Sequence, residues 1–182
     1  MFEINELKNN CQDKEYYKNA LQESGLYLEW ASDEIKDDKD MVLQAVTQNP
    51  GALEFASNRL KGDKDVLMKS VDTVGWTVCY ASEDLRGDKD VILKAVKNDG
   101  QALYYASKEL RDDEEVVLEA VKNKGIIIKY ASLNCRSNIE IATTALLQNK
   151  KTMDYVKGCL NPEILENEEI QKIINPPEDE GK

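Results

Sequence analysis

The sequence has no histidine, few prolines and no long apolar run. Without histidine, a serine or cysteine nucleophile lacks its usual base, and a zinc site lacks its commonest ligand. No stretch approaches the roughly 20 apolar residues that a membrane-spanning helix needs. The first six residues are polar, unlike a signal peptide. We therefore expect a soluble cytoplasmic protein that is not an enzyme, with no cofactor, no metal site and no membrane partner.

Cysteine is also sparse, and its placement is irregular. The four cysteines are Cys11, Cys79, Cys135 and Cys159, and their spacings match neither a C-x-x-C pair nor a zinc site. We expect four free thiols in a reducing compartment.

Acidic residues outnumber basic ones, 35 to 24, which gives a net charge of −11 at pH 7. Such a charge repels nucleic acid and anionic membranes at long range and attracts basic proteins.

The strongest signal is an internal repeat of 25 residues. Columns of similar residues recur at this spacing with no insertion, and the clearest column is the dipeptide Ala-Ser, which begins at residues 31, 56, 81, 106 and 131. A further column is aromatic: Trp30, Phe55, Tyr80, Tyr105, Tyr130 and Tyr155. A fixed period of this length is typical of stacked helical repeats.

Each repeat reads as two short helices. In residues 88–112, Asp88 is a favourable N-cap, and apolar residues follow at helical spacing. Gly100 suits the left-handed position after the helix. A second helix is predicted from about Gln101 to Arg111, with Leu103, Ala106 and Leu110 on its buried face.

The predicted fold is all-α: a short α-solenoid of six two-helix repeats, of undetermined hand, with a C-terminal capping helix. We expect one domain over residues 1–175. Residues 1–12 fit no repeat and are candidates for an N-terminal cap, and the tail at residues 176–182 is expected to be disordered. The repeats are residues 13–37, 38–62, 63–87, 88–112, 113–137 and 138–162, and the capping helix lies in residues 163–175.

Two segments of the fourth repeat, residues 87–96 and 102–111, resemble the domain of unknown function 4116 repeat family. The resemblance is strongest over residues 36–133 and covers residues 13–162 more loosely. It implies tandem helical hairpins. It implies no activity and no site residues, because the family has no assigned function.

Three columns are candidate binding sites as well as structural features. The aspartates Asp38, Asp63, Asp88 and Asp113 would bind cations or act as N-caps, and we favour capping. The basic column would bind phosphate or stabilise helix C-termini near the next aspartate, and we favour the helix role. Aromatic rings would stack on bases or pack in the core, and we favour the core. The basic column is Lys36, Lys61, Arg86, Arg111 and Arg136.

The columns that vary between repeats are the candidate partner-binding surface. They contain residues that are unusually apolar for an exposed row, and Trp and Tyr are favoured at interface centres. Two interpretations remain open: these side chains form an interface, or some of them fill gaps between repeats. The candidate partner-binding residues are Trp76, Tyr104, Ile126, Ile127 and Lys129.

A non-enzymatic module that binds a protein partner is the function these features favour. One variant is an acidic inhibitor or immunity-type protein that neutralises a basic, nucleic-acid-handling partner. An alternative is nucleic-acid binding along the Lys/Arg column, which the net negative charge disfavours. The sequence does not determine the oligomeric state.

Overall fold

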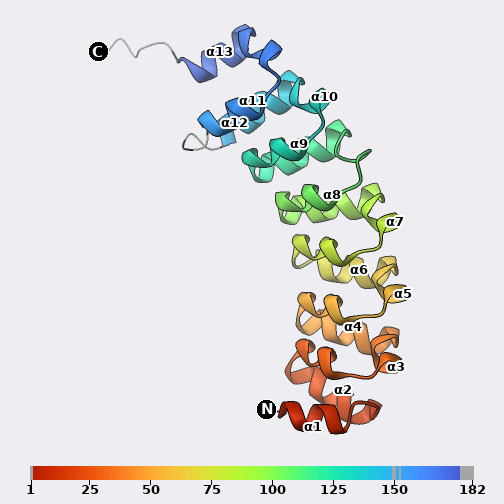
Figure 1. Cartoon of the computed structure of the whole chain (residues 1–182). Coiled ribbons are helices and arrows are strands. Elements are labelled where there is room, and N and C mark those ends of the chain that lie inside the picture. Colours follow the sequence, from red (N-terminus) through yellow and green to blue (C-terminus); the bar gives the residue numbers. More distant parts are fainter. Residues whose placement is uncertain (1, 149–150, 152, 177–182) are drawn as a thin grey trace.

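A computed structural model describes residues 2–148, 151 and 153–176 of the chain. Figure 1 shows helices stacked one after another into an elongated, curved array, with the N-terminus at one end and the C-terminal helix at the other. Among the described residues the regular elements are α-helices and 3-10 helices, and none is a strand. The prediction of an all-α repeat array is confirmed at this level.

Each repeat begins with an α-helix that an aspartate or asparagine side chain caps. In α8, the Asp88 carboxylate accepts hydrogen bonds from the backbone N–H groups of Asp90 and Val91. The apolar face of α8 is completely buried, as the sequence pattern predicts. The first helices are α2 (Lys14–Glu23), α4 (Lys39–Gln48), α6 (Lys64–Val71), α8 (Lys89–Asn98), α9 (Glu114–Asn123) and α11 (Ile139–Gln148).

In the first five repeats the second half differs from the prediction of one continuous helix, whereas the described part of the sixth repeat has the α-helix Met153–Cys159 in this place. A six-residue 3-10 helix comes first, and the chain then extends at the Ala-Ser dipeptide, so the "two-helix" description is wrong in this detail. The apolar stripe that predicted the second helix is buried all the same, because the 3-10 helix and the following turn both face the core. The 3-10 helices are η1 (Gly25–Trp30), η2 (Pro50–Phe55), η3 (Gly75–Tyr80), η4 (Gly100–Tyr105) and η5 (Gly125–Tyr130).

The Ala-Ser break connects neighbouring repeats. The backbone N–H of Ser107 donates to the carbonyl of Arg86 in the preceding repeat, and Ser57, Ser82 and Ser132 make the equivalent bond. The serine side chain also caps the next turn, as where Ser57 Oγ accepts from the Leu60 N–H. In the first, second, third and fifth repeats this turn is a four-residue helix, and in the fourth repeat it is not helical. These helices are α3 (Asp33–Lys36), α5 (Asn58–Lys61), α7 (Glu83–Arg86) and α10 (Leu133–Arg136).

The glycine that begins most 3-10 helices has a different role from the one predicted. No described glycine has a positive φ, so Gly100 is not in the left-handed conformation. A Cβ atom at Gly100 would lie 2.6 Å from the carbonyl oxygen of Ala120 in the next repeat. Glycine is therefore required because successive repeats approach closely at this point.

The two ends of the array carry helices outside the repeat pattern. Helix α1 (Ile4–Asn9) packs on η1 and buries Leu7, whose carbonyl accepts a hydrogen bond from the Tyr17 hydroxyl. At the other end, α13 (Glu168–Ile174) packs against α11 and buries Ile170. Along the chain, α12 (Met153–Cys159) and η7 (Pro162–Glu166) lie between α11 and α13. Most of the tail predicted to be disordered, residues 177–182, lies outside the described residues.

Candidate interaction surface

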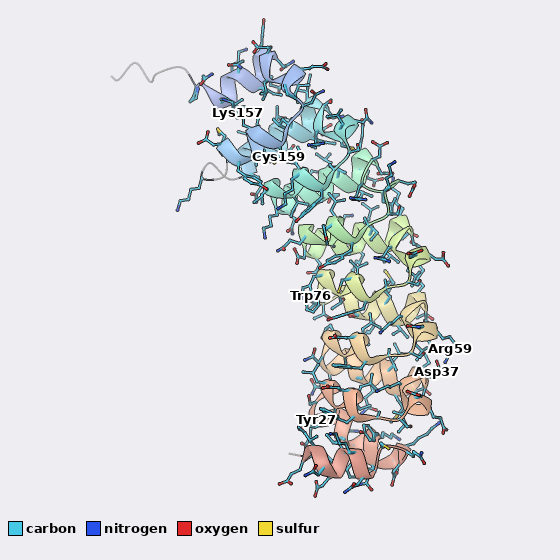
Figure 2. All side chains as sticks on the ribbon, viewed as in Figure 1. Tyr27, Asp37, Arg59, Trp76, Lys157 and Cys159 are labelled. Atoms are coloured by element: carbon cyan, nitrogen blue, oxygen red, sulfur yellow. The ribbon has the colours of Figure 1, made fainter. Side chains whose placement is uncertain are left out.

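The 3-10 helices lie side by side along one edge of the array, because η3 contacts η4 and η4 contacts η5. Figure 2 shows Trp76 and Tyr27 on this side of the stack, and Asp37 and Arg59 on the opposite side. Helices η3, η4 and η5 together present an aromatic surface, which we define by four residues: Trp76, Tyr104, Tyr105 and Tyr130.

The aromatic surface is held together by edge-to-face ring contacts. The Tyr104 ring centre lies 5.0 Å from that of Tyr105 and 4.9 Å from that of Tyr130, which belongs to the next repeat. The Trp76 and Tyr80 ring centres lie 5.9 Å apart. Such contacts restrict the rings, so a partner that binds them loses little side-chain entropy.

An open pocket of about 360 Å³ lies between these rings. Its walls are the four rings of the aromatic surface together with Asp99 and Gln101. Asp99 precedes η4, and its Oδ1 atom accepts a hydrogen bond from the Gln101 N–H, 2.9 Å away. The pocket therefore combines aromatic rings with a carboxylate that the backbone holds in place.

The predicted partner-binding residues fall into three groups. Trp76 and Tyr104 are exposed (41% and 55%), and Lys129 is also exposed. Ile126 is half-buried. Ile127 is only 3% exposed, so its assignment to a binding surface is wrong. It occupies the column of Ala52, Thr77 and Ala102, which are all buried, because this side of each 3-10 helix faces the core.

Lys129 of the fifth repeat links the aromatic surface to Tyr155 of the sixth repeat. Its ammonium nitrogen lies 4.7 Å from the centre of the Tyr130 ring and 5.7 Å from that of Tyr155, which is within the range of a cation–π interaction. The neighbouring Tyr130 and then Tyr155 phenol groups raise the pKa of Lys129, which favours the charged ammonium.

The aromatic column is neither a buried core nor an open stacking platform. From Trp30 to Tyr130 its rings are half-buried and pack against the core, whereas Tyr155 is exposed. Burial, and next a hydrogen bond to Glu54, raises the pKa of Tyr80 to about 12. Burial is also the main reason that the pKa of Tyr105 is raised, and the nearby Asp99 charge adds to it. Both phenols are therefore neutral at pH 7.

Sequence reasoning missed four residues of the pocket as binding residues. Tyr105 and Tyr130 belong to the aromatic column, for which we favoured the core, Gln101 was placed at the start of the predicted second helix, and Asp99 was given no binding role. A signal was available for Asp99, which is the one acidic residue of its column in the sequence; the other members are Ser24, Asn49, Val74, Lys124 and Asn149. After each 3-10 helix the chain extends at the Ala-Ser dipeptide, and this interruption exposes the rings on this edge. The sequence contains no comparable signal for it.

The aspartate column caps helices, as we favoured, and also forms ion pairs between repeats. Lys64 Nζ lies 2.7 Å from the Asp88 carboxylate of the next repeat and 3.5 Å from Asp90. Lys14, Lys39 and Lys89 make the equivalent contacts. The partners of the aspartates are thus these lysines, and not the basic column at the end of each repeat as the sequence had indicated.

The basic column is packed between repeats. All five of its side chains are half-buried, and Arg136 donates to the backbone carbonyl of Cys159 at 3.1 Å. The Nε atoms of Arg86, Arg111 and Arg136 are buried without a hydrogen-bond partner. A column that is so poorly exposed is not an open surface for a phosphate backbone.

No helix in residues 2–148 or 153–176 is long and apolar enough to span a membrane. Across the same residues, no group of three or more cysteine, aspartate or glutamate side chains is arranged to hold a metal ion.

These features define a class, the all-α proteins built from tandem short-helix repeats. The sequence profile of the family described as domain of unknown function (DUF4116) matches three consecutive segments, residues 13–61, 63–111 and 113–157. The chain therefore belongs to this family. Each matched segment covers two successive 25-residue repeats or most of them. No curated protein and no solved structure matches the chain.

Proposed function

We propose that this chain is a non-enzymatic protein-binding module, an α-solenoid of six repeats that acts in the cytosol and binds a protein partner through the aromatic surface. The observation that carries the proposal is the exposure of Trp76 and Tyr104 beside the 360 Å³ pocket. Large aromatic side chains that are held rigidly and remain open to solvent are typical of interface centres.

The charge of the molecule favours a basic partner. The net charge is −11, and the acidic side chains Asp65, Asp90 and Glu115 remain largely exposed although they pair with lysines. An acidic inhibitor of a basic, nucleic-acid-handling protein is the finer form of the proposal. Direct nucleic-acid binding is disfavoured, because the Lys/Arg column is packed between repeats and the field of the molecule is negative.

The test is capture of a partner from lysate of the source cell, with and without nuclease, by the natural sequence and by matched variants. Trp76→Ala and Tyr104→Ala each remove an exposed ring. We expect each to weaken partner binding by about 1–2 kcal/mol, which is roughly five- to thirtyfold. Leu133→Ala is the control, since Leu133 is similarly exposed (57%) but lies on α10 and does not line the aromatic pocket.

A stoichiometric protein that survives nuclease, is kept by Leu133→Ala and is lost with both ring variants supports the proposal. Capture that is equal for all variants contradicts it. If nuclease treatment abolishes capture, the bound partner is a nucleic acid and not a protein.

A further inference from the structure

The aromatic edge of the array already binds positive charges of this same chain at two places. Near the N-terminus, Lys8 Nζ lies 4.6 Å from the centre of the Trp30 ring. In the fifth repeat, Lys129 lies over Tyr130 and close to Tyr155. Within the described residues, no Lys or Arg lies over Trp76, Tyr104 or Tyr105, so the middle of this edge has rings without a cation.

The pocket between these rings also has a negative charge available. Asp99 Oδ1 accepts from the Gln101 N–H, whereas no described residue makes a hydrogen bond or an ion pair to Oδ2. The Gln101 side chain, which is exposed beside it, adds an amide oxygen as a second acceptor.

We propose that this pocket binds an arginine side chain of a protein partner, with the guanidinium group against the rings of Trp76 and Tyr104 and its N–H groups directed to Asp99 and Gln101. The inference rests on the proposed protein-binding function and specifies the chemistry of the partner.

A guanidinium fits these walls better than other groups do. It is planar, so it stacks on aromatic faces, and its five N–H donors match several acceptors at once. An anionic group would meet the Asp99 carboxylate and the field of a chain with a net charge of −11. An apolar side chain would leave the carboxylate buried without a partner.

The experiment uses the full chain and a defined probe, the blocked tripeptide acetyl-Gly-Arg-Gly-amide. The same peptide with citrulline removes the charge but keeps the shape, and a lysine peptide keeps the charge but not the planar fork. Trp30→Phe leaves Trp76 as the single tryptophan, and it is a mild change because Phe55 occupies the same column one repeat later. Trp76 fluorescence then reports on the pocket.

Asp99→Asn is the decisive variant because the chain supplies its own structural control. Asn49 stands in the same column, and its side-chain oxygen accepts from the Gly51 N–H at 2.9 Å, as Asp99 does from Gln101. An asparagine therefore keeps this cap and removes only the charge. Glu29→Gln, which neutralises an exposed acid in the first repeat, controls for the loss of net charge.

We expect the arginine peptide to bind with a dissociation constant on the order of 1 mM. Asp99→Asn should weaken this binding by about tenfold, the lysine peptide should bind several-fold more weakly, and the citrulline peptide should not bind. Glu29→Gln should bind as the parent does. Far-ultraviolet circular dichroism that matches the parent shows that each variant is folded.

Equal binding of the arginine and citrulline peptides, equal binding of the arginine and lysine peptides, or an unchanged affinity in Asp99→Asn overturns the arginine assignment. So does the absence of any arginine-peptide binding. The partner-capture experiment is independent of this one. If Trp76→Ala loses the partner but Asp99→Asn keeps it, the proposed protein-binding function is supported and only the arginine assignment is wrong.

Discussion

At the scale of single residues, the distance between repeats decides which positions tolerate a side chain. Gly25, Gly75, Gly100 and Gly125 each begin a 3-10 helix directly beneath an alanine carbonyl of the next repeat. A side chain there would collide with backbone, which cannot rotate away as a flexible side chain can. These glycines therefore set how closely the repeats stack, although their φ angles are ordinary.

We predict that Gly100→Ala lowers the free energy of unfolding by about 1–3 kcal/mol, because the new Cβ must displace the Ala120 backbone. Urea unfolding followed by circular dichroism measures the change. Gly158→Ala is the control, since a Cβ there meets nothing within 4 Å and Gly158 lies in helix α12. It should leave stability unchanged or raise it by up to about 1 kcal/mol. Equal effects of the two substitutions would contradict the steric argument.

Sequence reasoning at this scale succeeds where a column has one consistent cause. The capping role of the aspartates was predicted correctly, because a carboxylate before an apolar helical stripe can accept from the free N–H groups of that helix. It fails for Ile127, where a large apolar residue in a variable row looked exposed. The column of Ala52, Thr77 and Ala102 contains small residues that a sequence pattern does not identify as buried.

At the scale of elements, the starts of α4, α6, α8 and α9 each join two repeats through a lysine–aspartate pair. Asp88 caps α8 through its Oδ1 atom, while its Oδ2 atom pairs with Lys64 of the preceding repeat. The hydrogen bond from Lys64 is the largest cause that lowers the pKa of Asp88, and the N–H groups of Val91 and Asp90 add to it. Because the native pKa is lowered, this stabilisation is present above the ordinary aspartate pKa and is lost as the pH falls through the native pKa.

We predict that Asp88→Asn reduces the acid sensitivity of the protein. An asparagine keeps the cap, as Asn138 does for α11 by accepting from the Ile141 N–H at 3.2 Å, but it forms no ion pair and does not titrate. Between about pH 5 and pH 3, the urea midpoint should fall less steeply in the variant than in the natural sequence. The measurement is a series of urea titrations across this range. Identical slopes for the two proteins would show that the Lys64 pair contributes nothing.

The Ala-Ser break shows why the second half of the repeat could not be derived from helical periodicity. Leu103, Ala106 and Leu110 have the spacing of one helical face, and a 3-10 helix followed by a turn buries the same side chains. What selects the broken form is the bond from the Ser107 N–H to the Arg86 carbonyl, a contact between repeats. Local propensity carries no information about a hydrogen bond to another repeat.

At the scale of the whole molecule, the closely packed elements of the described residues belong to the same repeat or to successive repeats, and the array grows by addition (Figure 1). The core is correspondingly continuous from Leu7 to Ile170. Stability in such an array is approximately a sum of repeat and interface contributions, and it should depend on register more than on chain length. The fixed 25-residue period made the sequential packing of repeats visible in the sequence.

We predict that deletion of residues 88–112, one whole repeat, leaves a folded protein. The new junction joins Gly87 to Asp113, which reproduces the natural Gly62-Asp63 and Gly87-Asp88 sequences, so every later column keeps its register. Helical circular dichroism should persist, and the urea m-value should fall by about one-sixth, since one repeat of six is lost.

Deletion of residues 88–99 is the matched control: it removes fewer residues but places η4 directly after α7, where a capped first helix is needed to cover the core. That variant should lose cooperative unfolding although it is longer. If the shorter deletion folded and the whole-repeat deletion did not, stability would depend on chain length or on particular residues of the fourth repeat, and the additive description of the array would be wrong.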